Sequence, residues 1–430
     1  MSLVEPDVRS SSGSLAADPI GSGDPPCESN ELISRAALPI FGKLSSLPVL
    51  DGVRGLAVLL VLAFHFLFNS PDISRTAPSA DSLRMLSFVG WTGVDLFFVL
   101  SGFLITRILL NARPNPGYFR NFYARRVLRI FPLYYATLAF VLLLLPALSD
   151  ACGRYAAGMG GDQAYLWTYT YNIATLCVPG QVKVLHFGHF WSLCIEEHFY
   201  LFWPLLVWFL GVRGVRRGCF LLIAAAIACP VGLHLAGVHA TAIFYFTPCR
   251  VDSLAMGAWV ATYAVDATGR QQALPSTWLR RAVVIGVVAV LVEGLVIALD
   301  HGGMRGGAWS QSIGFTVIAV IWTCLLVAAL CSRAEGLLPR SLCSRAMRSL
   351  GKYSYGLYVL HPLVFLAMGG WVAAAATAVV GHTGVASNLL GLLFMFGVLT
   401  ILSFAAAFCV YQLLERPFLG LKRFFEYKPR

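Results

Sequence analysis

Residues 50–66 read LDGVRGLAVLLVLAFHF, and this stretch decides the fold class. It places Arg54 at the start of an apolar run and His65 inside it. At about 1.5 Å of rise per residue, eleven helical steps carry His65 roughly 16 Å beyond Arg54. If Arg54 lies at one edge of a hydrocarbon layer roughly 30 Å thick, His65 lies near its middle. Ionisable side chains at that depth are costly and usually functional.

The composition of the whole chain agrees with a membrane protein. Of its 430 residues 58% are hydrophobic and 12% are charged, and the mean hydropathy is +0.72. Soluble domains carry roughly 25% charged residues. Apolar runs near the roughly 20 residues that a spanning helix needs predict about ten transmembrane helices and an all-α fold. These runs lie at about 53–70, 88–110, 130–148, 191–211, 219–236, 243–265, 282–299, 310–332, 353–378 and 389–414.

The positive charges predict the topology. With ten helices, 26 of the 32 Lys and Arg residues fall on one set of flanks and 6 on the other, which puts both termini in the cytoplasm. The net charge of +11 lies in short loops, so nucleic-acid binding is not expected. Residues 1–48 are predicted as a disordered cytoplasmic tail, 49–418 as the transmembrane domain and 419–430 as a short cytoplasmic tail. A disulfide between Cys152 and Cys177, in one non-membrane segment, stays open.

Two ionisable residues of the first two apolar runs are candidates for chemistry. Imidazole is the side chain best suited to move a proton near neutral pH, so His65 is a candidate general base; the alternative is a His packed against a neighbouring helix. Asp95 lies a few residues into the second run, at a similar predicted depth. Its carboxylate could orient the imidazole, or it could cap its own helix.

A basic run on the predicted cytoplasmic side is a candidate phosphate site. Arg126 and Arg129 stand three apart, hence on one helical face, with Arg125 beside them. Guanidinium groups bind phosphates in bidentate fashion, so these residues and Arg54 would suit a cytosolic cofactor that carries phosphates. The alternative is a basic cluster that meets anionic lipid and fixes topology.

A polar block opens the fourth apolar run. Ser192 and Glu196 are one helical turn apart and predict a polar lining for an acceptor pocket. His186 and His189 lie just before them and could begin a metal site. No third and fourth ligand stand at a familiar spacing, so no metal is expected.

Taken together, these motifs resemble the acyltransferase-3 family of membrane O-acyltransferases, typified by bacterial O-antigen and exopolysaccharide O-acetyltransferases. The resemblance covers about residues 48–420. It rests on six pieces in order: Arg54 and His65 with ten residues between them, the Gly93–Phe103 block GVDLFFVLSGF, Arg126 and Arg129, the Trp191–Tyr200 block WSLCIEEHFY, the Tyr353–Pro362 block YSYGLYVLHP, and the Glu415–Phe418 block ERPF.

The resemblance implies transfer of an acyl group, usually acetyl from acetyl-CoA, to a sugar hydroxyl at the outer side of the plasma (inner) membrane. It makes His65 catalytic and makes Arg126 and Arg129 the acyl-CoA contact. His198 stands where the family commonly has Gln. Some relatives carry a C-terminal hydrolase-like domain; this chain shows none, so it is expected to complete the transfer itself or to use a separate partner.

Several alternatives remain open at this stage. The acyl group could pass through an acyl-enzyme on His65 or Ser192 instead of moving directly. The acceptor could be a lipid or a small antibiotic. Ten helices with buried charges could instead make a proton-coupled transporter, although no inverted repeat is visible. An inactive scaffold on the same fold is the last alternative, and the intact Arg and His set argues against it.

Overall fold

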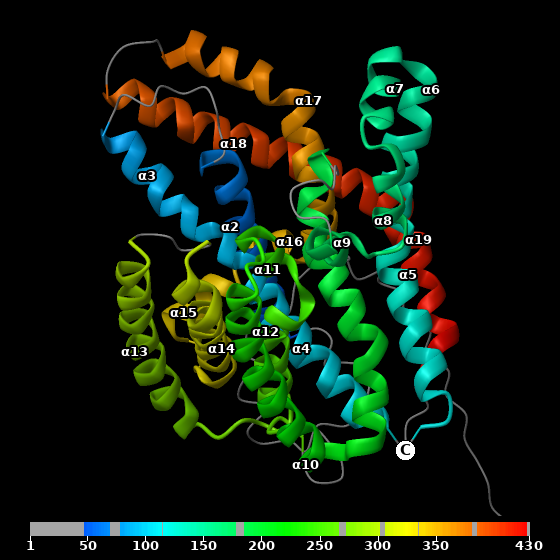
Figure 1. The fold of residues 1–430 in the computed structure, drawn as a ribbon, viewed down its shortest axis with the longest axis vertical. Helices are drawn as coiled ribbons and strands as arrows, with labels where there is room; N and C mark the ends of the chain where they lie inside the picture. The colour runs from blue at the N-terminus through cyan, green and yellow to red at the C-terminus, as the bar shows by residue number, and fades with distance from the viewer. Residues whose placement is uncertain are drawn as a thin grey trace, which may run out of the picture.

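The computed structural model describes residues 47–68, 78–113, 115–177, 185–265, 272–301, 306–333, 335–380 and 385–427. These residues form helices and no strand, which confirms the predicted all-α class. The predicted tail at 1–48 lies almost wholly outside them. The main helices are α2 (Pro48–Ala63), α3 (Pro78–Phe88), α4 (Gly93–Ala112), α5 (Tyr118–Ala139), α6 (Leu145–Leu148), α7 (Asp150–Ala157), α8 (Gln163–Trp167), α9 (Tyr171–Cys177), α10 (Trp191–Leu235), α11 (Ala240–Tyr245), α12 (Val251–Ala261), α13 (Thr277–Leu299), α14 (Phe315–Cys331), α15 (Leu337–Leu342), α16 (Arg345–Lys352), α17 (Ser354–Val380), α18 (Val385–Val410) and α19 (Arg416–Gly420) (Figure 1).

Within the described residues eight helices, not ten, are long and apolar enough to cross a membrane. The difference has two local causes. The predicted runs 191–211 and 219–236 are two helical parts of α10 that meet at the non-helical Gly211 and count as one span, and the longest helix of the run 243–265 is the short apolar α12. The chain is therefore a polytopic membrane protein, while the side on which its termini lie stays a prediction. The eight are Pro48–Phe68, Met85–Ala112, Tyr118–Leu148, Phe187–Leu235, Thr277–Leu299, Ser310–Cys331, Ser354–Val379 and Leu389–Phe425.

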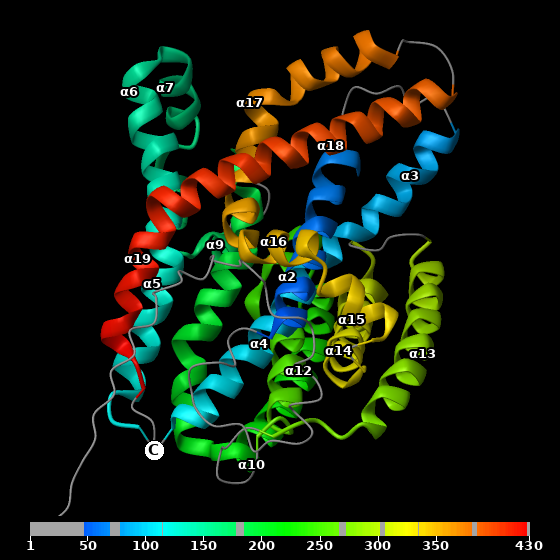
Figure 2. The same ribbon diagram turned by 180° about the vertical axis from the view of Figure 1, so that it is seen from behind.

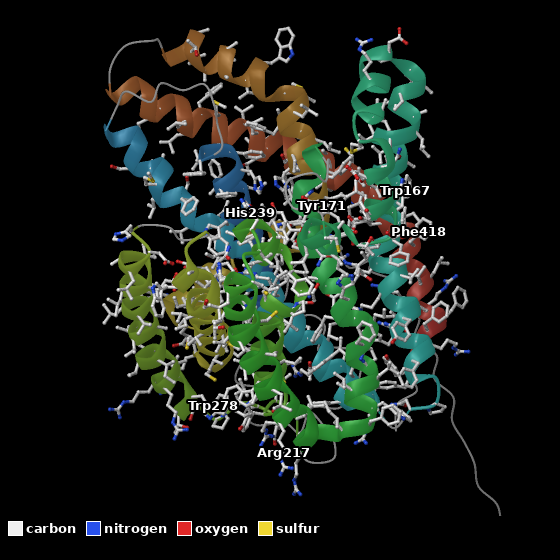
Figure 3. The ribbon with its side chains drawn as sticks, viewed as in Figure 1. Trp167, Tyr171, Arg217, His239, Trp278 and Phe418 are labelled. Carbon is white, nitrogen blue, oxygen red and sulfur yellow. The ribbon has the colours of Figure 1, made fainter. Side chains whose placement is uncertain are left out.

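Helix α10 is broken at Gly211, where φ is 60° and ψ is −173°. This left-handed φ favours glycine, and a Cβ there would also crowd the guanidinium of Arg113. Arg113 Nε donates to Trp208 O at 2.8 Å, next to the break. In Figure 1 α10 turns at the lower end of the molecule, and Figure 3 shows Arg217 pointing outward there. The two apolar segments are thus two helical parts joined by a sharp kink, which agrees with the two separate runs that the sequence predicts.

Helices α4 and α12 approach so closely that their backbones touch. A Cβ on Gly102 of α4 would overlap Leu254 O, and a Cβ on Gly257 of α12 would overlap Val99 O. Small residues at such crossings let membrane helices pack without an intervening side chain. The contact brings Asp95 of α4 beside the start of α12.

Helix α2 packs on α16 in the same way. A Cβ on Gly55 would overlap Met347 O, and a Cβ on Gly351 would overlap Asp51 O. The first turns of α2, which carry Arg54, are therefore fixed against a helix that is some 290 residues away in the sequence. In Figure 2, seen from behind, α16 crosses next to α2 and α4 in the centre, with α5 and α19 to the left.

The far end of α2 changes to a π-helical turn, Phe64–Phe68, which carries His65. Such turns often occur at functional sites. Helices α17 and α18 run side by side above it in both ribbon views. Cys152 and Cys177, whose pairing stayed open, are both free thiols.

Candidate functional site

A cavity of about 1120 Å³ lies among α2, α4, α5, α10, α16, α17 and the C-terminal segment. The structure brings to it all four arginines that the sequence predicted as a phosphate site. Ser192 and Glu196, from one face of α10, also line this cavity. The cations that line the cavity are Arg54, Arg107, Arg125, Arg126, Arg129, Arg345, Arg348, Lys352 and Lys422.

These nine cations face few acids. Asp51, Glu196 and Glu426 are the acidic residues of the lining. Arg54 donates to Asp51 at 2.6 Å. Outside the lining, Glu415 Oε2 lies 3.4 Å from Arg129 Nη1. The cavity therefore carries an excess of positive charge, which a bound anion would compensate.

The C-terminal segment is part of this cavity and not a separate tail. Asn121 Nδ2 donates to Glu426 O at 3.0 Å, and Arg125 Nη1 donates to Phe425 O at 3.2 Å. These bonds hold Tyr427 in the lining, where burial raises its pKa to about 12 although Arg126 and Arg125 act in the opposite direction. The phenol of Tyr427 is thus a neutral hydrogen-bond donor at physiological pH, and its Oη has no partner among the described residues.

At another part of the lining, polar groups of α10 meet α17 and α4. Ser192 Oγ and Tyr358 Oη are 2.5 Å apart, and Tyr358 Oη donates to His189 O at 2.9 Å. One turn further, Tyr200 Oη donates to Glu196 Oε2 at 3.0 Å. Ser192, Glu196 and Tyr358 thus form a polar part of the cavity lining, while the predicted place of Ser192 and Glu196 in an acceptor pocket stays a prediction.

His65 belongs to a cluster of three histidines, two of which, His189 and His361, lie next to Tyr358. Its Nδ1 is 2.9 Å from Val61 O, and because a carbonyl only accepts, Nδ1 carries the proton. This leaves the lone pair on Nε2. The ring of His361 lies 4.6 Å from the ring of His65, and that of His189 lies 5.4 Å from His361. His65 itself is not among the residues that line the cavity.

His361 was part of a quoted motif, but the sequence assigned it no role. Its side chain is fully buried in α17, and its Nδ1 is 3.0 Å from Leu357 O and 2.9 Å from Tyr358 O. Both contacts are carbonyls, so Nδ1 is the donor and Nε2 is an acceptor. Nε2 is buried and has no hydrogen-bond partner among the described residues. The histidine of a block Tyr-x-x-His-Pro at the start of a membrane helix was the available signal.

Asp95 has a different environment from the one expected. Its Oδ1 accepts from Arg250 Nη2 at 2.6 Å and from Ser253 Oγ at 3.0 Å. Both charged side chains are fully buried. The Arg250 guanidinium also lies 4.0 Å from the ring centre of Phe315 and 5.1 Å from that of Phe244. The contacts seen for Asp95 therefore join α4 to the start of α12, and its predicted role beside His65 stays a prediction.

No metal cluster is found in the part of the chain that the structure describes: it contains no group of three or more His, Cys, Asp or Glu side chains placed to bind an ion. The side chain of His186 lies outside that part, whereas His189 belongs to the histidine cluster.

Comparison with known proteins identifies the family. The sequence model of the acyltransferase-3 family, described as an acyltransferase domain, matches residues 47–411. The O-acetyltransferase OatA of Staphylococcus aureus is 25% identical over 327 residues, which are 73% of this chain and 50% of that protein. The putative peptidoglycan O-acetyltransferase YrhL of Bacillus subtilis is 29% identical over 336 residues, 74% of this chain and 49% of that protein.

The peptidoglycan O-acetyltransferase OatA of Listeria monocytogenes is 26% identical over 339 residues, with the same shares of 74% and 49%. The chain thus spans about half the length of the curated relatives that it matches. No solved structure matches it with significance. The family match covers the helices that carry the arginine cluster, Ser192, Glu196 and the three histidines. The chain belongs to the acyltransferase-3 family of membrane acyltransferases.

Proposed function

We propose that this protein transfers an acyl group, acetyl by preference, from cytosolic acyl-CoA to a hydroxyl of a carbohydrate at the outer side of the plasma membrane. One observation carries the proposal. A single cavity joins nine cations to the Ser192–Tyr358 pair, and the histidine cluster lies directly behind that pair. One site can thus bind an anionic donor next to a group that can move a proton.

The charge of the cavity fits the donor. CoA carries a diphosphate and a separate 3′-phosphate, and guanidinium groups bind such oxygens with charge-assisted hydrogen bonds. The Nε atom of Arg126 is buried without a hydrogen-bond partner among the described residues. Its guanidinium also lies 5.9 Å from the ring centre of Tyr200, next to Glu196. A phosphate on Arg126 would therefore bind in the same cavity that Ser192 and Glu196 line.

The chemistry we propose is general base catalysis by His65. Nε2 of His65 takes the proton of the acceptor hydroxyl as the oxygen bonds to the thioester carbonyl carbon. The C–S bond then breaks, and the CoA thiolate takes the proton back from the imidazolium to leave as the thiol. Ser192 and Glu196 lie between the arginines and the histidines, where they can hold the acceptor hydroxyl and the thioester carbonyl. An acyl-serine on Ser192 is the two-step version of the same transfer.

The acceptor class is inferred from the relatives. Two of them are named for peptidoglycan, a glycan polymer. For this chain we propose a carbohydrate, with a lipid or a small antibiotic as the alternatives. Comparing surface glycans by mass spectrometry in cells with and without the gene would reveal the acceptor as a missing acetyl ester.

The first prediction tests the donor. Purified protein in lipid nanodiscs should release CoA thiol from acetyl-CoA when a glycan acceptor is present. Arg126→Gln should raise KM for acetyl-CoA by roughly 10- to 100-fold, because it removes a charge-assisted contact of about 1.5–3 kcal/mol. Arg217→Gln is the control, since Arg217 is exposed at the bend of α10 and outside the cavity (Figure 3). Proton-coupled solute uptake without thiol release would contradict the proposal and favour a transporter.

The second prediction concerns His361. We propose that its Nε2 accepts a hydrogen bond from protonated His65 and so stabilises the charge that forms during transfer. His361→Phe should lower kcat by roughly 10- to 100-fold and leave KM for acetyl-CoA unchanged, which is the size expected for losing a bond to a charged group. His361→Gln keeps an acceptor oxygen and should recover part of the rate. Equal losses in both variants would show that the residue matters only for packing.

A further inference from the structure

The cations of α16 form a group of their own. Arg345, Arg348 and Lys352 stand at positions i, i+3 and i+7, which is one face of a helix. All three line the cavity. Ser344 caps the helix by accepting from Met347 N at 3.3 Å. We call these three residues the α16 cluster, and Arg125, Arg126 and Arg129 the α5 cluster.

The α16 cluster has no acidic partner among the described residues. The ion pairs among the described residues join Arg54 to Asp51, Arg129 to Glu415 and Arg250 to Asp95, and none of them includes a residue of α16. The Nε atom of Arg348 is buried and without a hydrogen-bond partner, as is that of Arg126 in the α5 cluster. Each cluster thus presents a buried guanidinium nitrogen that nothing in the described chain satisfies, and a donor left so is costly unless a ligand binds it.

The helix is held in place independently of any ligand. The backbone contacts of Gly55 with Met347 and of Gly351 with Asp51 fix α16 against α2. Lys352 Nζ lies 5.2 Å from the ring centre of Tyr353 and 5.4 Å from that of Tyr411. Positive charge is therefore presented from a rigid support, as a binding site for a fixed anion requires.

The two clusters differ in their distance from the reacting groups. Arg126 lies over the ring of Tyr200, whose hydroxyl bonds Glu196. Arg345 and Lys352 are exposed to solvent, so they belong to the mouth of the cavity. In CoA the diphosphate is the anionic group nearer to the thioester, and the 3′-phosphate on the ribose is the farther one.

Resting on the proposed function, we propose that the α16 cluster is the binding site for the 3′-phosphate of the acyl-CoA donor. The α5 cluster then takes the diphosphate. This division explains why one cavity contains two groups of cations, and it makes the enzyme selective for CoA over thioesters that lack the ribose phosphate.

The test compares acetyl-CoA with acetyl-dephospho-CoA, which lacks only the 3′-phosphate. The double variant Arg345→Gln/Arg348→Gln should raise KM for acetyl-CoA by roughly 10- to 100-fold and leave KM for acetyl-dephospho-CoA unchanged. The unaltered protein should show the same rise when it is given acetyl-dephospho-CoA. Arg340→Gln, on the neighbouring α15 and outside the cavity lining, is the matched control.

Equilibrium binding gives a second readout that does not need turnover. Adenosine 3′,5′-bisphosphate should bind the unaltered protein more tightly than adenosine 5′-monophosphate, and the double variant should bind both equally. A KM that rises equally for both thioesters, or for neither, overturns the assignment to the 3′-phosphate. If the unaltered protein still uses acetyl-CoA in that experiment, the transferase function stands and only the assignment of the 3′-phosphate fails. If it does not use acetyl-CoA at all, the proposed function itself fails.

Discussion

Replacing His65 with Ala is expected to abolish acyl transfer while the protein stays folded in the membrane. Nδ1 of His65 is fixed by Val61 O, so Nε2 is the nitrogen that can accept a proton, and Ala removes it. General base catalysis contributes typically 10²- to 10⁴-fold, so kcat should fall by roughly that factor. Thiol release from acetyl-CoA in the presence of the glycan acceptor is the measurement.

The control for this variant is His239→Ala. His239, labelled in Figure 3, is exposed at the start of α11, where its ring accepts from Thr241 N, and it is not among the residues that line the cavity. Its loss should leave kcat unchanged. Binding of acetyl-CoA to His65→Ala should be retained, because the arginines are untouched. Substantial acylation of the acceptor by His65→Ala would remove the general base from the mechanism.

Ser192→Ala separates the two routes of transfer in the same assay. If the acyl group moves directly, Ser192 only holds a substrate and its loss should reduce kcat modestly. If an acyl-serine forms, the loss should match that of His65→Ala, and a radiolabelled acetyl group should remain on the unaltered protein when the acceptor is omitted.

The sequence predicted the fold class because apolar length is a local property. Each of the ten runs contains helix in the structure. The count of spanning helices differed because it depends on backbone geometry at particular positions. The two helical parts of α10 meet at the non-helical Gly211 and so count as one span, whereas the run 243–265 is interrupted before α12 by the extended Phe246 and a short turn at Thr247–Cys249. Hydropathy separates the two parts of α10 but does not register the interruption before α12.

The grouping of candidate residues was predictable where they share one helical face. Arg126 and Arg129, like Ser192 and Glu196, lie on single helices, and the structure places all four in one cavity. Partners from distant helices were not predictable. The contact of His65 with His361 depends on how α2 packs against α17, which no spacing in one sequence reveals.

Asp95 shows the same limit. Its predicted depth matched that of His65, but depth does not specify which neighbour a side chain faces. Its observed partner, Arg250, is 155 residues away and lies at the start of another helix. The cations of α16 had likewise been counted as topology signals, because only the folded chain shows that they face a cavity.

The pairing of Asp95 with Arg250 leads to the last prediction. Asp95→Asn should lower the free energy of unfolding by about 3–5 kcal/mol, the usual cost of removing one partner from a buried ion pair. The guanidinium of Arg250 would then stay buried among Phe244 and Phe315 without its partner carboxylate. Thermal unfolding in detergent is the measurement. Arg250→Met should cost less, because the remaining carboxyl of Asp95 can become neutral by binding a proton.

The double variant Asp95→Asn/Arg250→Met should recover most of the stability, since it removes both charges and leaves no buried ion. This cycle also separates the two roles of Asp95. If the carboxylate serves only α4 and α12, kcat per folded molecule in the double variant should equal that of the unaltered protein. If the carboxylate orients His65 as the sequence predicts, stability should return while kcat stays low, because the double variant has no carboxylate left to orient the imidazole.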